Sequence, residues 1–271
     1  MKILIYISVF ILVLIAFSCS SDDTADNEDQ QIESIDYFPL FTNSNWTYNN
    51  VSEQGKTRDS LYVAGTEVLN SFTYTNLDAE QPATAFMTML LSQNLVRTVE
   101  KQLILNGELN TSPIDGLPII GIPLSDVVLF NAETAPNTLL SSIENEIKQE
   151  VNGIPLVVEY VIRSIQGGFL TNYAVDAQIF EDVISSQIVV TLKVTAEIEI
   201  FPGIIIQIPI LAEQDVMIVT NYYAANIGLI FSEVLIEYEL EDLSGTGIEL
   251  PFPSQASSAT YQSIDTFEIG S

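Results

Sequence analysis

Apolar and polar residues alternate with a period of two along most of the chain that follows Ile35. The alternation is clearest over residues 187–201, and this period is typical of a β-strand with one face in a core and the other in water. We therefore predict a strand there. Its core face carries Ile188, Val190, Leu192, Val194, Ala196, Ile198 and Ile200, and its other face carries Gln187, Thr191, Lys193, Thr195, Glu197 and Glu199.

The same pattern predicts a long hairpin. Phe201-Pro202-Gly203 supplies a turn, and a second apolar stretch covers residues 204–223. Pro209 interrupts that stretch, which indicates a bulge or an edge position. At about 3.3 Å per residue, strands of this length approach ~50 Å, so the sheet has to be curved or broken by bulges.

Asn152-Gly153 lies between two alternating segments, residues 143–151 and 154–165, and predicts a second hairpin. A helix is the alternative for the first segment, because Ile143, Ile147 and Val151 also have helical spacing. Asn106-Gly107 is a further candidate turn.

The remaining pattern is that of an all-β domain. Residues 111–123 are rich in Pro and Gly and are expected to form a loop, and residues 244–271 either add a final strand or hang free. We predict one mainly β domain over residues 35–271, a single strongly curved antiparallel sheet, half-barrel or sandwich-like, with little helix. Its other strands are expected at 45–52, 60–63, 68–76, 95–105, 127–131 and 228–240.

The start of the chain has the pattern of an export signal. Lys2 precedes an apolar run over residues 3–17 that is short for a bilayer span, and the single cysteine, Cys19, follows directly. The segment resembles the lipobox of bacterial lipoproteins, although Ala16 and Phe17 depart from the usual residues. The resemblance implies that residues 1–18 form a signal peptide, that cleavage falls between Ser18 and Cys19, and that Cys19 is lipidated. An uncleaved anchor and an ordinary secretory peptide are the alternatives.

Residues 19–34 are acidic and contain almost no apolar side chain, so they are expected to form a disordered tether. Ser20 is not the aspartate that retains many lipoproteins in the inner membrane, and Asp22-Asp23 resembles signals for surface export. These resemblances imply a lipid-anchored protein of the outer membrane, with exposure at the cell surface.

Charge and composition exclude several functions. The net charge is −28, which repels nucleic acid and anionic headgroups, so the expected membrane contact is the lipid on Cys19. The chain has no histidine, so the usual general base and the commonest zinc ligand are missing. Cys19 is its only cysteine, so a lipidated Cys19 leaves no thiol nucleophile. No nucleotide-binding motif occurs, and we expect neither a cofactor nor a metal. Acidic pairs such as Glu181/Asp182, Asp115/Asp126 and Glu197/Glu199 are expected to be solvated faces.

The aromatic residues near both ends of the predicted domain carry a second resemblance. Trp46 is expected to pack in the core, with a sugar-stacking platform as the alternative. Phe38-Pro39-Leu40 with Trp46-Thr47-Tyr48, and Tyr222-Tyr223-Ala224 with Ile227-Gly228-Leu229-Ile230, are similar to FPLxxGxxWxY and YYAxxVGLV segments of uncharacterised bacterial outer-membrane lipoproteins. The resemblance implies a curved antiparallel sheet like the half-barrel of lipoprotein carriers.

Two short segments, Asp23-Thr24-Ala25 and Asp59-Ser60-Leu61, are similar to an O-glycosylation sequence of exported bacterial proteins. They make Thr24 and Ser60 candidate modification sites.

The sequence favours a non-enzymatic binding or structural module. The alternative is a carrier of an apolar ligand, such as a lipid or a lipoprotein acyl chain, on an open isoleucine-rich face. A glycan is a further candidate ligand, and a carboxylate-dependent glycan-active enzyme is the third hypothesis.

Overall fold

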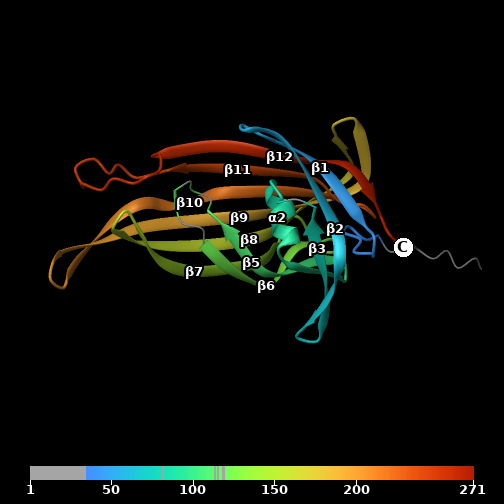
Figure 1. Cartoon of the computed structure of the whole chain (residues 1–271), viewed down its shortest axis with the longest axis horizontal. Helices are drawn as coiled ribbons and strands as arrows, with labels where there is room; N and C mark the ends of the chain where they lie inside the picture. Colours follow the sequence, from blue (N-terminus) through green and yellow to red (C-terminus); the bar gives the residue numbers. More distant parts are fainter. Residues whose placement is uncertain (1–34, 81, 113, 115, 118–119) are drawn as a thin grey trace, which may run out of the picture. The chain divides into compact units, whose positions relative to one another are not determined.

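A single antiparallel sheet contains all twelve strands of the part of the chain that the structure describes (Figure 1). The computed structural model describes residues 35–80, 82–112, 114, 116–117 and 120–271. The signal peptide, Ser18, Cys19, Thr24 and the tether lie outside these residues. The strands are β1 Asn45–Ser52, β2 Gly55–Leu69, β3 Phe72–Ala79, β4 Leu95–Val99, β5 Gln102–Thr111, β6 Ile120–Asn131, β7 Leu139–Val151, β8 Ile154–Val175, β9 Gln178–Phe201, β10 Ile204–Ala224, β11 Gly228–Glu239 and β12 Gln255–Glu268.

The sheet order is β6-β5-β4-β3-β2-β1-β12-β11-β10-β9-β8-β7. The sheet curls until its edge strands β6 and β7 come close together, which makes it nearly closed and barrel-shaped (Figure 1). The predicted fold class, one strongly curved antiparallel sheet with little helix, is therefore confirmed. The C-terminal segment is its seventh strand in spatial order, because β12 pairs with both β1 and β11.

Side chains bridge the seam between β6 and the β7–β8 hairpin. The Val128 N–H donates to Ser141 Oγ over 3.0 Å, and the Ser164 hydroxyl donates to the Val128 carbonyl. The Asn131 N–H donates to Gln166 Oε1 over 2.8 Å. These bonds satisfy backbone groups of an edge strand that would otherwise lack partners.

Turn chemistry was predicted correctly at one hairpin and wrongly at another. Asn152 and Gly153 both have positive φ, 51° and 79°, and join β7 to β8, so residues 143–151 are strand and the helical alternative is wrong. Gly107 lies inside β5 at a shift of register, so Asn106-Gly107 forms a bulge and not a turn. The expected strand over 95–105 is instead two strands, because Glu100 and Lys101 take φ of 47° and 59° and form a turn.

The isoleucine-rich face of β9 is a core surface along most of its length. Side chains from Ile188 to Ala196 on this face are buried against the interior of the sheet. β8 pairs with β9 as far as Ala196. Beyond Ala196, β9 pairs with β10 alone, and because this two-stranded end of the hairpin extends past β8, Ile200 is 49% exposed. Shifts of register around Pro209 confirm the predicted bulge.

A short helix, α2 (Phe86–Ser92), was not predicted. It packs against β2, β3 and β4, and its Met87, Thr88, Leu90 and Leu91 are buried. Among the described residues, no helix has both the length and the apolar character needed to cross a bilayer.

The buried carboxylate of Asp59 fixes the start of α2. It accepts hydrogen bonds from the Thr84 N–H, the Thr84 hydroxyl and the Ala85 N–H at 2.9–3.2 Å. An acid on β2 therefore supplies the N-terminal acceptor that the helix lacks locally, which holds α2 against the inner face of the sheet.

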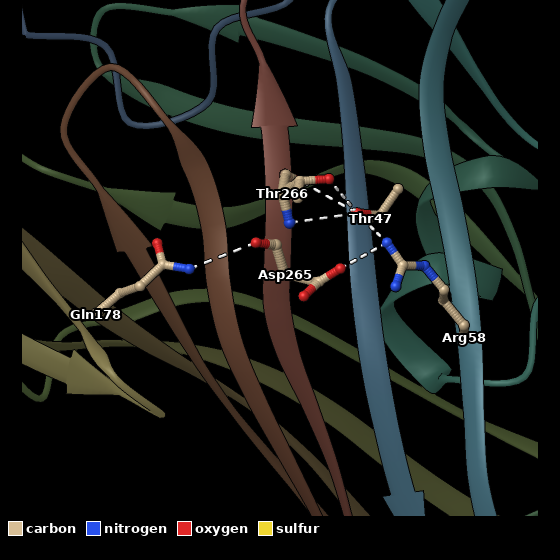
Figure 2. A network of polar contacts seen from close by, with 5 residues as sticks. All are labelled: Thr47, Arg58, Gln178, Asp265 and Thr266. Atoms are coloured by element: carbon tan, nitrogen blue, oxygen red, sulfur yellow. Dashed lines mark hydrogen bonds and ion pairs between the residues drawn. The ribbon is translucent and has the colours of Figure 1, made fainter.

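The outer face of β1, β2 and β12 carries a polar network (Figure 2). Arg58 pairs with Asp265 at 2.5 Å and donates to Thr47 Oγ1, which also contacts the Thr266 hydroxyl at 2.6 Å. Gln178, at the β8–β9 turn, donates to the Asp265 carbonyl. The ion pair is partly exposed and the guanidinium is already paired, so this network ties strands together and leaves no free cation for a ligand.

Candidate binding pocket

A pocket of about 260 Å³ opens beside the β1–β2 turn, and we call it the end pocket. One wall comes from β1 and the start of β2, a second from the residues that lead into α2, and a third from β11 and β12. Its lining consists of Asn50, Val51, Ser52, Gln54, Thr57, Thr84, Ala85, Phe86, Ser232, Val234, Thr260, Tyr261 and Gln262.

A row of buried polar side chains crosses the inner face of the sheet and reaches this pocket. Its members are directly opposed cross-strand partners on six adjacent strands, and each is at most 7% exposed. The alternation that directs apolar residues into the barrel places these polar residues there too. This polar row consists of Gln166 on β8, Ser186 on β9, Asn221 on β10, Ser232 on β11, Gln262 on β12 and Asn50 on β1.

Some polar atoms in the row are bonded within the described part of the chain. Gln166 bonds through both ends of its amide, to the Asn131 N–H and to the Ser185 carbonyl. The Gln262 amide nitrogen donates to Thr88 Oγ1 on α2 over 2.5 Å. The Asn50 amide nitrogen donates to Thr84 Oγ1 over 3.0 Å. The last two bonds hold Asn50 and Gln262 in fixed orientations at the pocket wall.

Other atoms of the polar row are buried and have no hydrogen-bond partner among the described residues. They are Asn50 Oδ1, Gln262 Oε1, Ser186 Oγ, Ser232 Oγ and both amide atoms of Asn221. Leaving a buried donor or acceptor unpaired costs about 1–3 kcal/mol. Three of the side chains concerned, Asn50, Ser232 and Gln262, line the end pocket. The pocket therefore has hydrogen-bonding capacity that the fold itself does not use.

Two buried tyrosines adjoin the row. Tyr48 on β1 and Tyr223 on β10 have no exposed surface, and burial raises the pKa of both phenols above the ordinary value. The neighbouring Ser186 side chain offsets part of this rise in the pKa of Tyr223. Both phenols stay neutral at physiological pH, so they add polarity to the interior but no charge.

The end pocket is electrically neutral. No Asp, Glu, Lys or Arg is among its lining residues, although the whole chain has a net charge of −28. The carboxylate of Asp59 accepts hydrogen bonds from the lining residues Thr84 and Ala85, but Asp59 is not itself a lining residue. Phe86 and Val234 supply aromatic and apolar walls, whereas the ring of Tyr261 stacks on Phe231, on the opposite face of the sheet from Gln262. The arrangement suits hydrogen bonding with apolar contact, and it offers no counter-charge to an ion.

Other hollows are less suited to a ligand. A groove of about 440 Å³ on β7, β8, β9 and β10 is lined by Glu144, Glu146, Glu159 and Glu213, with Lys193 paired to Glu159 at 2.6 Å. In the described part of the chain, no three acids or other ligating side chains are grouped so that they could hold a metal ion.

An apolar cavity lies between α2 and the strands near the seam, bordered by Phe86, Leu129, Ile162 and Ile188. It measures about 20 Å³, which is near the space needed for one water molecule. The covered isoleucine face therefore has little room for an acyl chain there.

Of the residues that the sequence singled out, Trp46 is placed in the core. Its ring is fully buried and stacks on Phe38 with centroids 5.4 Å apart, and its indole N–H donates to the Ile227 carbonyl over 2.6 Å. The two aromatic segments therefore pack against each other. Ser60 lies half-buried on β2 opposite Thr47, and its glycosylation stays a prediction.

Sequence reasoning did not find the polar row. A signal was present, because Asn221, Ser232 and Gln262 occupy the inward positions of alternating strands where apolar residues are expected. What the sequence did not show is that these positions become neighbours across separate strands.

Comparisons with known proteins add a distant likeness. No protein-family model and no curated protein matches the sequence. Among solved structures, the chain is similar to a protein from Parabacteroides distasonis ATCC 8503 that is described as a "putative lipoprotein". The two are 11% identical with a TM-score of 0.37, and the match covers 86% of this chain and 99% of the other.

Proposed function

We propose that this chain is an exported lipoprotein, anchored by lipid on Cys19 at the outer membrane or cell surface, that binds a small molecule in the end pocket. The protein acts as a binding module and not as an enzyme. Sequence supports the anchor, since an apolar leader precedes the single cysteine and an acidic segment follows it. The acidic chain has no evident basic attachment to anionic lipids, so acyl chains supply the membrane affinity.

One observation carries the binding role: three side chains that line the pocket, those of Asn50, Ser232 and Gln262, carry buried polar atoms without a partner among the described residues. Natural folds pair nearly all buried polar groups, and exceptions call for a specific explanation. A ligand that completes these bonds provides one. The neutral lining, without an acid–base pair, supports binding over catalysis.

Cys19→Ala tests the anchor. The variant is expected to lose metabolically incorporated palmitate and to leave the membrane fraction, because the thiol that carries the lipid is gone. Fractionation of cells that express the full chain measures both, with Ser21→Ala as the matched control. If Cys19→Ala keeps its acyl label and stays in the membrane fraction, the anchor has been assigned wrongly.

Thr260→Trp tests the pocket. Thr260 is a half-buried lining residue, and an indole there is expected to fill the space and reduce the co-purifying ligand at least tenfold. The full chain is purified in a detergent without a sugar headgroup, and the small molecules released on denaturation are quantified by mass spectrometry.

Ser257→Trp is the matched control, because Ser257 is exposed on the same strand and does not line the pocket. The binding role is supported if one compound is present in the wild type and in Ser257→Trp but is depleted from Thr260→Trp. It is overturned if the wild type releases no such compound or if Thr260→Trp retains it.

A further inference from the structure

We propose that the molecule bound in the end pocket is uncharged, rich in hydroxyl groups and about the size of one sugar ring. This inference rests on the proposed binding function and names its ligand class. Three properties of the pocket support this ligand class: the chemistry of the unpartnered atoms, the charge of the lining and the volume.

The unpartnered atoms select for a molecule that both donates and accepts hydrogen bonds. Asn50 Oδ1 and Gln262 Oε1 are acceptors, and each needs a donor from the ligand. Ser232 Oγ can donate or accept. Cα atoms of Ser232 and Gln262 are direct cross-strand partners, as are those of Asn50 and Gln262, so the three groups form a contiguous set. Neighbouring hydroxyl groups on one small molecule match this set.

The lining selects against ions. An anion would meet two amide oxygens and no cation, and a cation would find no free carboxylate among the lining residues. Transfer of an unpaired charge into such a site is costly, whereas a neutral hydroxyl exchanges its bonds to water for bonds to the protein.

The walls and the volume limit the ligand further. Phe86 offers aromatic surface, and Val234 offers an aliphatic one, to the C–H groups of a ring. A volume of about 260 Å³ lies just below the ~300–1,000 Å³ range of pockets for drug-sized ligands. A long acyl chain or a peptide would not be enclosed.

The ligand class is tested by titrating the full chain, in a detergent without a sugar headgroup, with glucose, galactose, mannose and N-acetylglucosamine, monitored by nuclear magnetic resonance. Glucose 6-phosphate and 1-hexanol represent the anionic and the apolar class. At least one neutral sugar is expected to bind saturably and at least tenfold more tightly than both of these probes.

Ser232→Ala is expected to weaken binding of that sugar about 3- to 10-fold, the effect of one neutral hydrogen bond. Its melting temperature should be unchanged or higher, because the hydroxyl has no partner among the described residues. Ser263→Ala is the control: Ser263 is half-buried next to Gln262 and does not line the pocket. A purely structural Ser232 would instead lower the melting temperature without changing affinity.

The inference is overturned if no sugar of the panel saturates, if glucose 6-phosphate or 1-hexanol binds as tightly, or if Ser232→Ala leaves the affinity unchanged. The binding function fails separately, when the released compound is the same in the wild type and in Thr260→Trp. If Thr260→Trp depletes a compound that is charged or apolar, the end pocket is a binding site but the proposed ligand class is wrong.

Discussion

Replacing Trp46 by alanine is expected to lower the free energy of unfolding by about 3–5 kcal/mol, the loss typical of a buried tryptophan. The ring has no exposed surface, and it stacks on Phe38 and bonds to the Ile227 carbonyl. Gly228, with φ of 114°, lets the backbone approach the indole, since a Cβ there would lie 3.2 Å from Trp46 Nε1. Removing the indole therefore opens a cavity and leaves the start of β1 without its contacts to the β10–β11 turn.

Urea unfolding followed by far-ultraviolet circular dichroism measures this loss, because Trp46 is the only tryptophan and its fluorescence disappears with it. Val68→Ala is the control: Val68 is 69% exposed, so the expected change is within about 0.5 kcal/mol. A loss below about 1 kcal/mol for Trp46→Ala would show that this ring does not join the two aromatic segments.

Raising the pH above about 10 is expected to destabilise the fold steeply, because the unfolded state then ionises tyrosines that the folded state keeps neutral. Burial raises the pKa of Tyr48 and of Tyr223, and it raises the pKa of Tyr173 to about 12. Below pH 10 these phenols are neutral in both states and have no effect. Above it, the free energy of unfolding should fall by about 1.4 kcal/mol per pH unit for each buried phenol.

Tyr48→Phe separates this effect from general alkaline damage. The Tyr48 hydroxyl has no hydrogen-bond partner among the described residues, so the variant should match the wild type in stability near pH 7. Between pH 10 and 11.5 its unfolding free energy should fall less steeply, by about 1.4 kcal/mol per pH unit. Equal slopes for both proteins, in urea titrations across this range, would contradict the assignment.

Local pattern predicted the long strands, but the expected strand over 68–76 runs across the turn between β2 and β3, and the expected loop over 111–123 includes the start of β6. The alternation over 187–201 and 204–223 predicted β9 and β10, and Asn152-Gly153 predicted the turn between β7 and β8. The turn at Glu100–Lys101 was missed because neither residue type favours positive φ. Helix α2 was missed because it is seven residues long and depends on Asp59, which is distant in sequence.

Closure of the sheet and the candidate site depend on contacts that no local pattern specifies. The seam forms where Ser164 and Gln166 meet β6. The polar row requires Asn221, Ser232 and Gln262 to be in register across three strands. In the sequence, each of these residues is a single polar position in an alternating strand. The three become neighbours only through the register of the strands, which the sequence pattern does not specify.

The most direct test of the central claim is a crystal structure of the full chain soaked with the neutral sugar that binds most tightly. We predict electron density for the sugar in the end pocket, with hydroxyl oxygens within hydrogen-bond distance of Gln262 Oε1 and Ser232 Oγ. An end pocket that holds only water at a saturating sugar concentration, or a sugar bound elsewhere on the chain, would contradict the account.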